Sequence, residues 1–73
     1  MKKYKIIYLE PELPSFSWQK GLYFVYKEID NEVYLGKIKS DGTPDCYDDG
    51  NYNILITGKG NKGIIPTNLT IEL

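Results

Sequence analysis

The residue types that do most enzyme chemistry are scarce in this chain of 73 residues. It contains no His and no Arg, and its nine basic residues are all Lys. Without His there is no Ser–His or Cys–His pair and no imidazole to act as a base or a metal ligand. The one cysteine, Cys46, can form neither an internal disulfide nor a cysteine-rich zinc site. We therefore expect no enzyme activity, no cofactor and no bound metal.

Aspartates gather in the turn-rich segment 40–50 and invite a calcium-binding interpretation. They are Asp41, Asp45, Asp48 and Asp49. Counted from Asp45, an EF-hand loop needs ligands at its third and last positions, where this chain has Tyr47 and Ile56. Two interpretations remain: solvated carboxylates of a turn, and an acidic contact that steers a basic partner to the surface. Asp45, Asp48 and Asp49 are accordingly candidate protein-binding residues.

The segment Gly58–Gly63, Gly-Lys-Gly-Asn-Lys-Gly, has the composition of a phosphate-binding loop but not its residue order. A tight hairpin turn accounts better for its glycines. Nucleic-acid binding stays an alternative function, because four lysines would form a basic face if their strands pair, and aromatic side chains stack on bases. These lysines are Lys37, Lys39, Lys59 and Lys62. The net charge of -1 and the absence of Arg disfavour that alternative.

Alternating apolar and polar residues predict a single all-β domain that spans residues 1–73. Residues 22–29 are apolar on both faces as far as Lys27, which is typical of a strand that is central in its sheet or faces a partner. No window has the periodicity of a helix, and Ala is absent. The predicted strands cover Lys3–Leu9, Leu22–Ile29, Glu32–Lys39 and Tyr52–Thr57. After Ile64, Ile65 and Pro66, a last short strand is predicted with Leu69, Ile71 and Leu73 on one face.

Three segments resemble parts of SH3 domains and follow one another in the same order. Residues 16–21, Phe-Ser-Trp-Gln-Lys-Gly, resemble the diverging turn, and residues 33–38, Val-Tyr-Leu-Gly-Lys-Ile, resemble the strand with the Trp-Trp-x-Gly pattern. Residues 63–73, which begin Gly-Ile-Ile-Pro-Thr-Asn, resemble the end of the domain. The resemblance implies a small SH3-like β-barrel of about five to six short strands, with an extended distal hairpin between Ile38 and Gly63. It also implies that Trp18 plugs one end of the barrel.

The chain departs from SH3 domains at the residues that bind proline-rich peptides. Val33 stands where the family has its groove Trp, and Leu69 stands where it has the Tyr that follows Pro-x-Asn. Of the family's ligand groove only Pro66 is clearly retained. Proline-rich ligands are therefore not inferred, and Pro66 is kept as a candidate binding residue.

A narrow barrel cannot enclose all the large apolar side chains of this chain. If Tyr34, Gly36 and Ile38 face the interior, Val33 and Leu35 face outward, and one of the two side-chain sets on strand 22–29 must do the same. A contiguous exposed patch would mark a protein interface, whereas scattered apolar groups are ordinary at a surface. The predicted protein-binding residues are Tyr23, Val25, Val33, Leu35, Asp45, Asp48, Asp49 and Pro66.

The sequence thus favours a small protein-interaction module that binds a partner protein or a second copy of itself. No stretch of about 20 apolar residues could span a membrane. The lone thiol and the lack of a recognisable export segment favour the cytoplasm. The Lys, Ile, Asn and Tyr bias indicates AT-rich codons, which would suit a small bacterial or phage protein.

Overall fold

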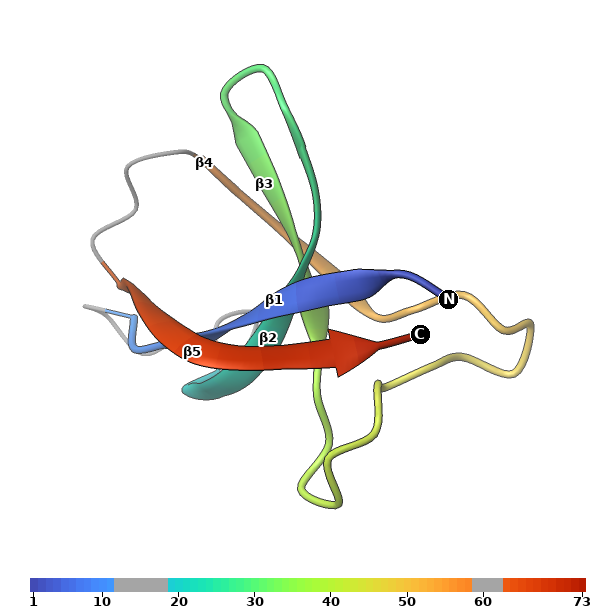
Figure 1. Cartoon of the computed structure of the whole chain (residues 1–73). Coiled ribbons are helices and arrows are strands. Elements are labelled where there is room, and N and C mark those ends of the chain that lie inside the picture. The colour runs from blue at the N-terminus through green and yellow to red at the C-terminus, as the bar shows by residue number, and fades with distance from the viewer. Residues whose placement is uncertain (12–18, 59–62) are drawn as a thin grey trace.

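Five antiparallel strands form one sheet in the computed structural model, which describes residues 1–11, 19–58 and 63–73 (Figure 1). The strands are β1 (Lys3–Leu9), β2 (Gly21–Ile29), β3 (Glu32–Lys37), β4 (Ile54–Gly58) and β5 (Ile64–Glu72). The predicted all-β fold is confirmed. The roles predicted for Phe16 and Trp18, and the hairpin tip with Lys59 and Lys62, lie outside the described residues.

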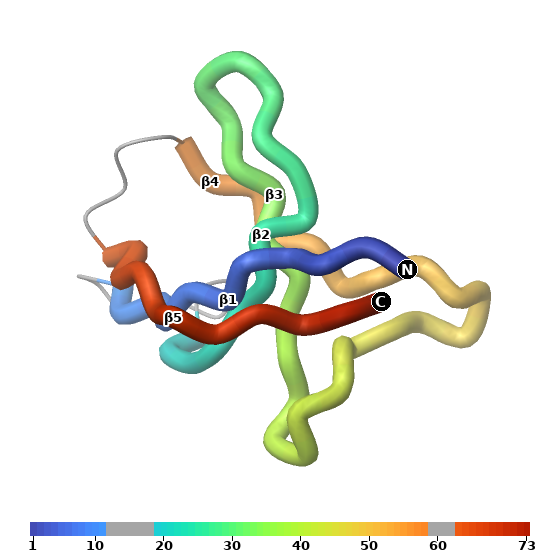
Figure 2. The backbone as a smooth tube through the Cα atoms, in the orientation of Figure 1, coloured from blue at the N-terminus to red at the C-terminus, as the bar shows by residue number. Residues whose placement is uncertain are grey.

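The strand order is β4-β3-β2-β1-β5, which places β2 at the centre of the sheet, as its two-sided apolar pattern predicts. The sheet is strongly twisted, so that β3 runs steeply across the direction of β1 and β5 (Figure 2). Among the described residues, β4 pairs with β3 and β5 pairs with β1, and no ladder joins β4 to β5. A closed SH3-like barrel therefore stays a prediction.

One face of the sheet carries an aliphatic core. Its buried members come from the three inner strands, and Val25, Leu55 and Ile64 pack against them. The buried members are Ile7, Leu9, Tyr23, Val33 and Leu35. Leu9 and Leu35 have no exposed surface.

The opposite face of β2 is covered as well, by an aromatic cluster around Phe24. The Phe24 ring is fully buried and lies 5.5 Å from the ring of Tyr4 and 5.4 Å from the ring of Tyr52, centroid to centroid. Tyr26 completes the cluster, 6.4 Å from Phe24. Beneath the Phe24 ring lies Gly36 of β3, whose missing side chain leaves the room that the ring occupies. The middle of β2 is thus buried on both faces.

Tyr52 reaches Phe24 from the long connection between β3 and β4, residues 38–53, here called the arm. The arm extends away from the strands and then folds back (Figure 2). Isolated bridges join Ile38 to Pro44 and Cys46 to Tyr52, and the Asn53 amide donates to the Asp45 carbonyl at 2.8 Å. The arm adds bridges but no further strand to the sheet.

The predicted outward orientation of Val33 and Leu35 is wrong. Val33 is 8% exposed and Leu35 is 0% exposed, because both fill the aliphatic core. Their neighbours Tyr34 and Gly36 belong to the other face, where Gly36 is needed under Phe24. The two side-chain sets of strand 22–29 are not divided into a buried one and an exposed one: Tyr23 and Phe24 are both buried, whereas Leu22 and Tyr26, from the set of Phe24, are exposed.

The contact between Gly36 and Phe24 predicts that Gly36→Ala strongly destabilises the protein. A Cβ at position 36 would overlap the Phe24 ring, with Cε2, the farthest of the three nearest ring atoms, 2.7 Å away. Overpacking of this kind costs about 1–3 kcal/mol or more. Urea unfolding should therefore show a lower midpoint for this variant.

Gly58→Ala in β4 is the matched control. Among the described residues, a Cβ there would meet only the Asn31 carbonyl oxygen, at an ordinary 3.8 Å. Gly→Ala without strain gains about 0.4–1 kcal/mol, because it restricts the unfolded chain. Equal unfolding midpoints for the two variants would contradict the packing of the Phe24 ring against Gly36.

Tyr23 gives a second prediction, on the pH dependence of stability. Its hydroxyl donates to the Gln19 carbonyl at 2.8 Å, and burial raises the pKa of the phenol above its ordinary value of 10.0. The folded state thus holds this proton more tightly than the unfolded chain does. The resulting stabilisation is fully present below pH about 10 and is lost as the pH rises through the raised pKa.

Tyr23→Phe should lower the free energy of unfolding by about 1 kcal/mol at neutral pH, because the hydrogen bond is lost. This difference in unfolding free energy between the variant and the wild type, the gap, should shrink above pH 10. Urea unfolding at a series of alkaline pH values measures both effects. Val25→Ala, which loses packing against the aliphatic core but removes no titratable group, is the control, and its difference in unfolding free energy from the wild type should not change with pH. A Tyr23→Phe gap that widens with pH would show that the linkage is wrong.

Candidate binding groove

A β-bulge in β2 places two side chains opposite one residue of β3. Val25 pairs with Leu35, but the next pair joins Lys27 to Tyr34, so that Tyr26 and Lys27 together face Tyr34. The Lys27 ammonium lies 4.7 Å from the centroid of the Tyr34 ring and 6.0 Å from that of Tyr26. The bulge therefore brings a cation onto the aromatic face of the sheet.

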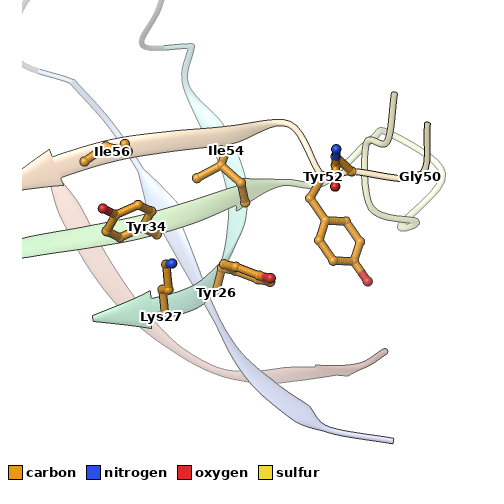
Figure 3. Close-up of a pocket in the computed structure, with 8 residues that line it drawn as sticks. Tyr26, Lys27, Tyr34, Gly50, Tyr52, Ile54 and Ile56 are labelled. Atoms are coloured by element: carbon orange, nitrogen blue, oxygen red, sulfur yellow. The ribbon is translucent and has the colours of Figure 1, made fainter. Parts of the chain in front are cut away.

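These side chains form one end of a surface groove with a volume of about 520 Å³ (Figure 3). Ile54 and Ile56 of β4 line it beside Tyr34. The arm contributes Gly50 and Tyr52 at the other end, and Asn51, between them in the sequence, also lines the groove. We call this surface the tyrosine groove, after Tyr26, Tyr34 and Tyr52.

The walls of the tyrosine groove combine apolar area with exposure. Tyr26 is 37% exposed and Ile56 is 51% exposed, while Tyr34, Tyr52 and Ile54 are half-buried. The rings of Tyr26 and Tyr52 pack edge to face with centroids 5.7 Å apart. The groove is thus an extension of the aromatic cluster to the surface, where the arm no longer covers it.

Hydrogen bonds fix the polar groups around the groove. The Tyr34 hydroxyl donates to the Glu32 carboxylate at 3.2 Å, and this hydrogen bond raises the pKa of the phenol. At the other end, Asp49 accepts hydrogen bonds from the backbone and side-chain amides of Asn51 at 2.9 and 3.0 Å. The Asp49 carboxylate therefore holds Asn51 in its place on the groove wall.

The predicted protein-binding residues do not gather at one site. Tyr23, Val33 and Leu35 are buried in the aliphatic core, and Val25 packs against it. Pro66 is exposed on β5, where it pairs with Ile7 of β1.

The aspartates of the arm have separate structural roles. Asp41 accepts hydrogen bonds from the backbone and hydroxyl of Thr43, which lower the pKa of its carboxyl group, and Asp45 accepts one from the Asn53 side chain at 3.1 Å. The described residues contain no group of three acidic, His or Cys side chains that could hold a metal ion. Asp48 and Asp49 are exposed and directly precede Gly50, at one end of the tyrosine groove.

The structure describes two of the four lysines of the predicted basic face, which stays a prediction. The Lys37 ammonium donates to the side-chain oxygen of Gln19 at 2.7 Å, and Lys39 is exposed on the arm. Lys59 and Lys62 lie outside the described residues. The lysine at the groove is instead Lys27, which the sequence did not single out.

Sequence reasoning missed the groove because its residues come from four separate segments and because the bulge interrupts the alternation in β2. Read strictly by parity, Lys27 would lie on the face of Tyr23 and Val25. The bulge moves it to the face of Tyr26. One available signal was that Tyr26 and Lys27 stand where the two-sided apolar pattern of strand 22–29 stops.

No family model, no curated protein and no solved structure matches this chain. The resemblance to SH3 domains therefore stays a prediction from three short segments. Within the described residues there is no helix long and apolar enough to cross a membrane.

Proposed function

We propose that this protein is a non-catalytic binding module that holds an extended segment of a partner protein in the tyrosine groove. The observation that carries the proposal is the exposure of Tyr26 and Ile56 beside the half-buried Tyr34 and Tyr52. Tyrosine provides large contact area with little conformational entropy to lose, which is why it is enriched at protein interfaces. Covering these side chains would release water from a continuous apolar strip.

The chemistry of the groove supports binding rather than catalysis. Its described lining offers phenols, one amide, one ammonium and aliphatic groups, and no carboxylate, thiol or imidazole lines it. A nucleophile with an adjacent base is the usual signature of covalent catalysis, and the lining has no such pair. The volume of about 520 Å³ is large enough for several side chains of a ligand.

A protein ligand suits the charge of the molecule better than a nucleic acid does. The net charge is -1, and Lys27 is the one cation among the described residues that line the groove. A nucleic acid places a phosphate at every nucleotide, and its binding depends on several cations along the backbone. The exposed thiol of Cys46 is consistent with a reducing compartment, and we place the module in the cytoplasm.

Selection from a library of random short peptides displayed on phage tests the proposal. We expect peptides to be enriched on the immobilised protein and to perturb backbone amide signals at the groove. Ile56→Asp should then weaken the binding of a selected peptide by about tenfold, because it places a charge on the apolar wall.

Leu69→Asp is the matched control, since Leu69 is 54% exposed on β5 and does not line the groove. It should leave the affinity within about twofold of the wild type. The proposal fails if no peptide is enriched, or if binding depends on Leu69 and not on Ile56.

A further inference from the structure

The ammonium of Lys27 lies against the aromatic wall of the tyrosine groove. The bulge aligns its backbone with Tyr34, and its ammonium rests over the Tyr34 ring at 4.7 Å (Figure 3). A cation over an aromatic face is attracted by the ring quadrupole, and an exposed contact of this kind is weak. The ring therefore orients the ammonium but leaves its hydrogen-bonding capacity available.

The charge of Lys27 is not neutralised by a carboxylate within the described part of the chain. The ion pair found there joins Lys3 to Glu72 at 4.0 Å, at the far end of β1 and β5. Glu32 of β3 accepts a hydrogen bond from the Tyr34 hydroxyl, and no ion pair joins it to Lys27 in the described part of the chain. An oriented ammonium with three donors and no acidic partner is suited to a ligand carboxylate.

Apolar side chains lie immediately beside this charge. Ile54 and Ile56 flank Tyr34 on the neighbouring strand, and in Figure 3 Lys27 lies next to Tyr34 on the same side of the sheet. A ligand that places a carboxylate on Lys27 would therefore set an adjacent side chain against the isoleucines. A ligand that makes both contacts has an acidic residue next to an apolar residue.

The opposite end of the groove limits the ligand to a small number of negative charges. Asp48 and Asp49 are exposed and directly precede Gly50 and Asn51, which line that end. A polyanion extended along the groove would place charge against these carboxylates. A segment with an isolated carboxylate avoids that repulsion.

We propose that the partner segment carries a carboxylate side chain next to an apolar residue, the carboxylate binding Lys27 and the apolar side chain packing against Ile54, Ile56 and Tyr34. This inference rests on the proposed function, because it assigns the ligand class of the same groove. It makes Lys27 the residue that sets both the position and the charge preference of the ligand.

The test compares peptides that phage selection returns on the wild type with those returned on Lys27→Met. We expect acidic residues next to apolar ones in the first set, and apolar residues without that acidic enrichment in the second. A selected peptide resynthesised with Gln in place of its Glu should bind the wild type roughly threefold to tenfold more weakly at low salt. The same change should have no effect on binding to Lys27→Met.

Two further variants separate a charge effect from a folding effect. Lys27→Arg keeps the cation and should retain the preference for Glu over Gln. Lys5→Met removes an exposed lysine of β1 that does not line the groove, and it should retain the preference as well. Amide spectra with native dispersion confirm that each variant is folded.

The outcomes distinguish failure of the acidic ligand from failure of the binding module. Peptides that bind the groove without a preference for Glu over Gln would overturn the acidic ligand and leave the binding module intact. An absence of groove-binding peptides would overturn both. Tighter binding of a single-stranded oligonucleotide than of any peptide, with an affinity that falls steeply with salt, would also overturn both and assign the groove to nucleic acid.

Discussion

The contact between the Phe24 ring and Gly36 is the constraint on which the rest of this small fold depends. The Phe24 ring can pack against the backbone of β3 only at a residue without a side chain, and Gly36 is that residue. Once Phe24 is there, Tyr4 and Tyr52 can close around it with centroid separations of 5.5 and 5.4 Å. Because Tyr52 belongs to the arm, the same contact ties a long irregular segment to the sheet.

The result is a sheet that is packed on both faces of its central strand. A chain of 73 residues buries a small fraction of its surface compared with larger domains, so a single core of modest size contributes little stability. Here the aliphatic core around Leu9 and Leu35 is complemented by the aromatic cluster on the other face. The arm thereby acts as a second layer over part of β2 and β3. The tyrosine groove lies where that layer ends.

The sequence predicts where the strands lie, but it does not predict which side of each strand faces the core. The alternation in Lys3–Leu9 predicts β1 with its observed bounds, and the two-sided apolar run predicts the central β2. The outward orientation predicted for Val33 and Leu35 is wrong because periodicity shows which residues share a face of a strand but not which face is buried. That choice depends on Gly36 receiving Phe24, a contact between two strands that no single strand pattern contains. The place of Lys27 beside the groove was not predicted for a related reason, since a bulge shifts its parity.

The bulge and the glycine act at neighbouring positions of the same strand pair, and together they determine what the aromatic face presents. Gly36 admits Phe24 and keeps that part of the face buried. One residue pair beyond Val25 and Leu35, the bulge turns Lys27 onto this face, at the place where the arm no longer covers it. An unbroken ladder would leave Tyr26 and Tyr34 as a neutral apolar surface. With the bulge, that surface acquires a single positive charge. A charge beside an apolar wall favours ligands with a complementary charge, whereas a purely apolar wall binds apolar segments with little discrimination between them.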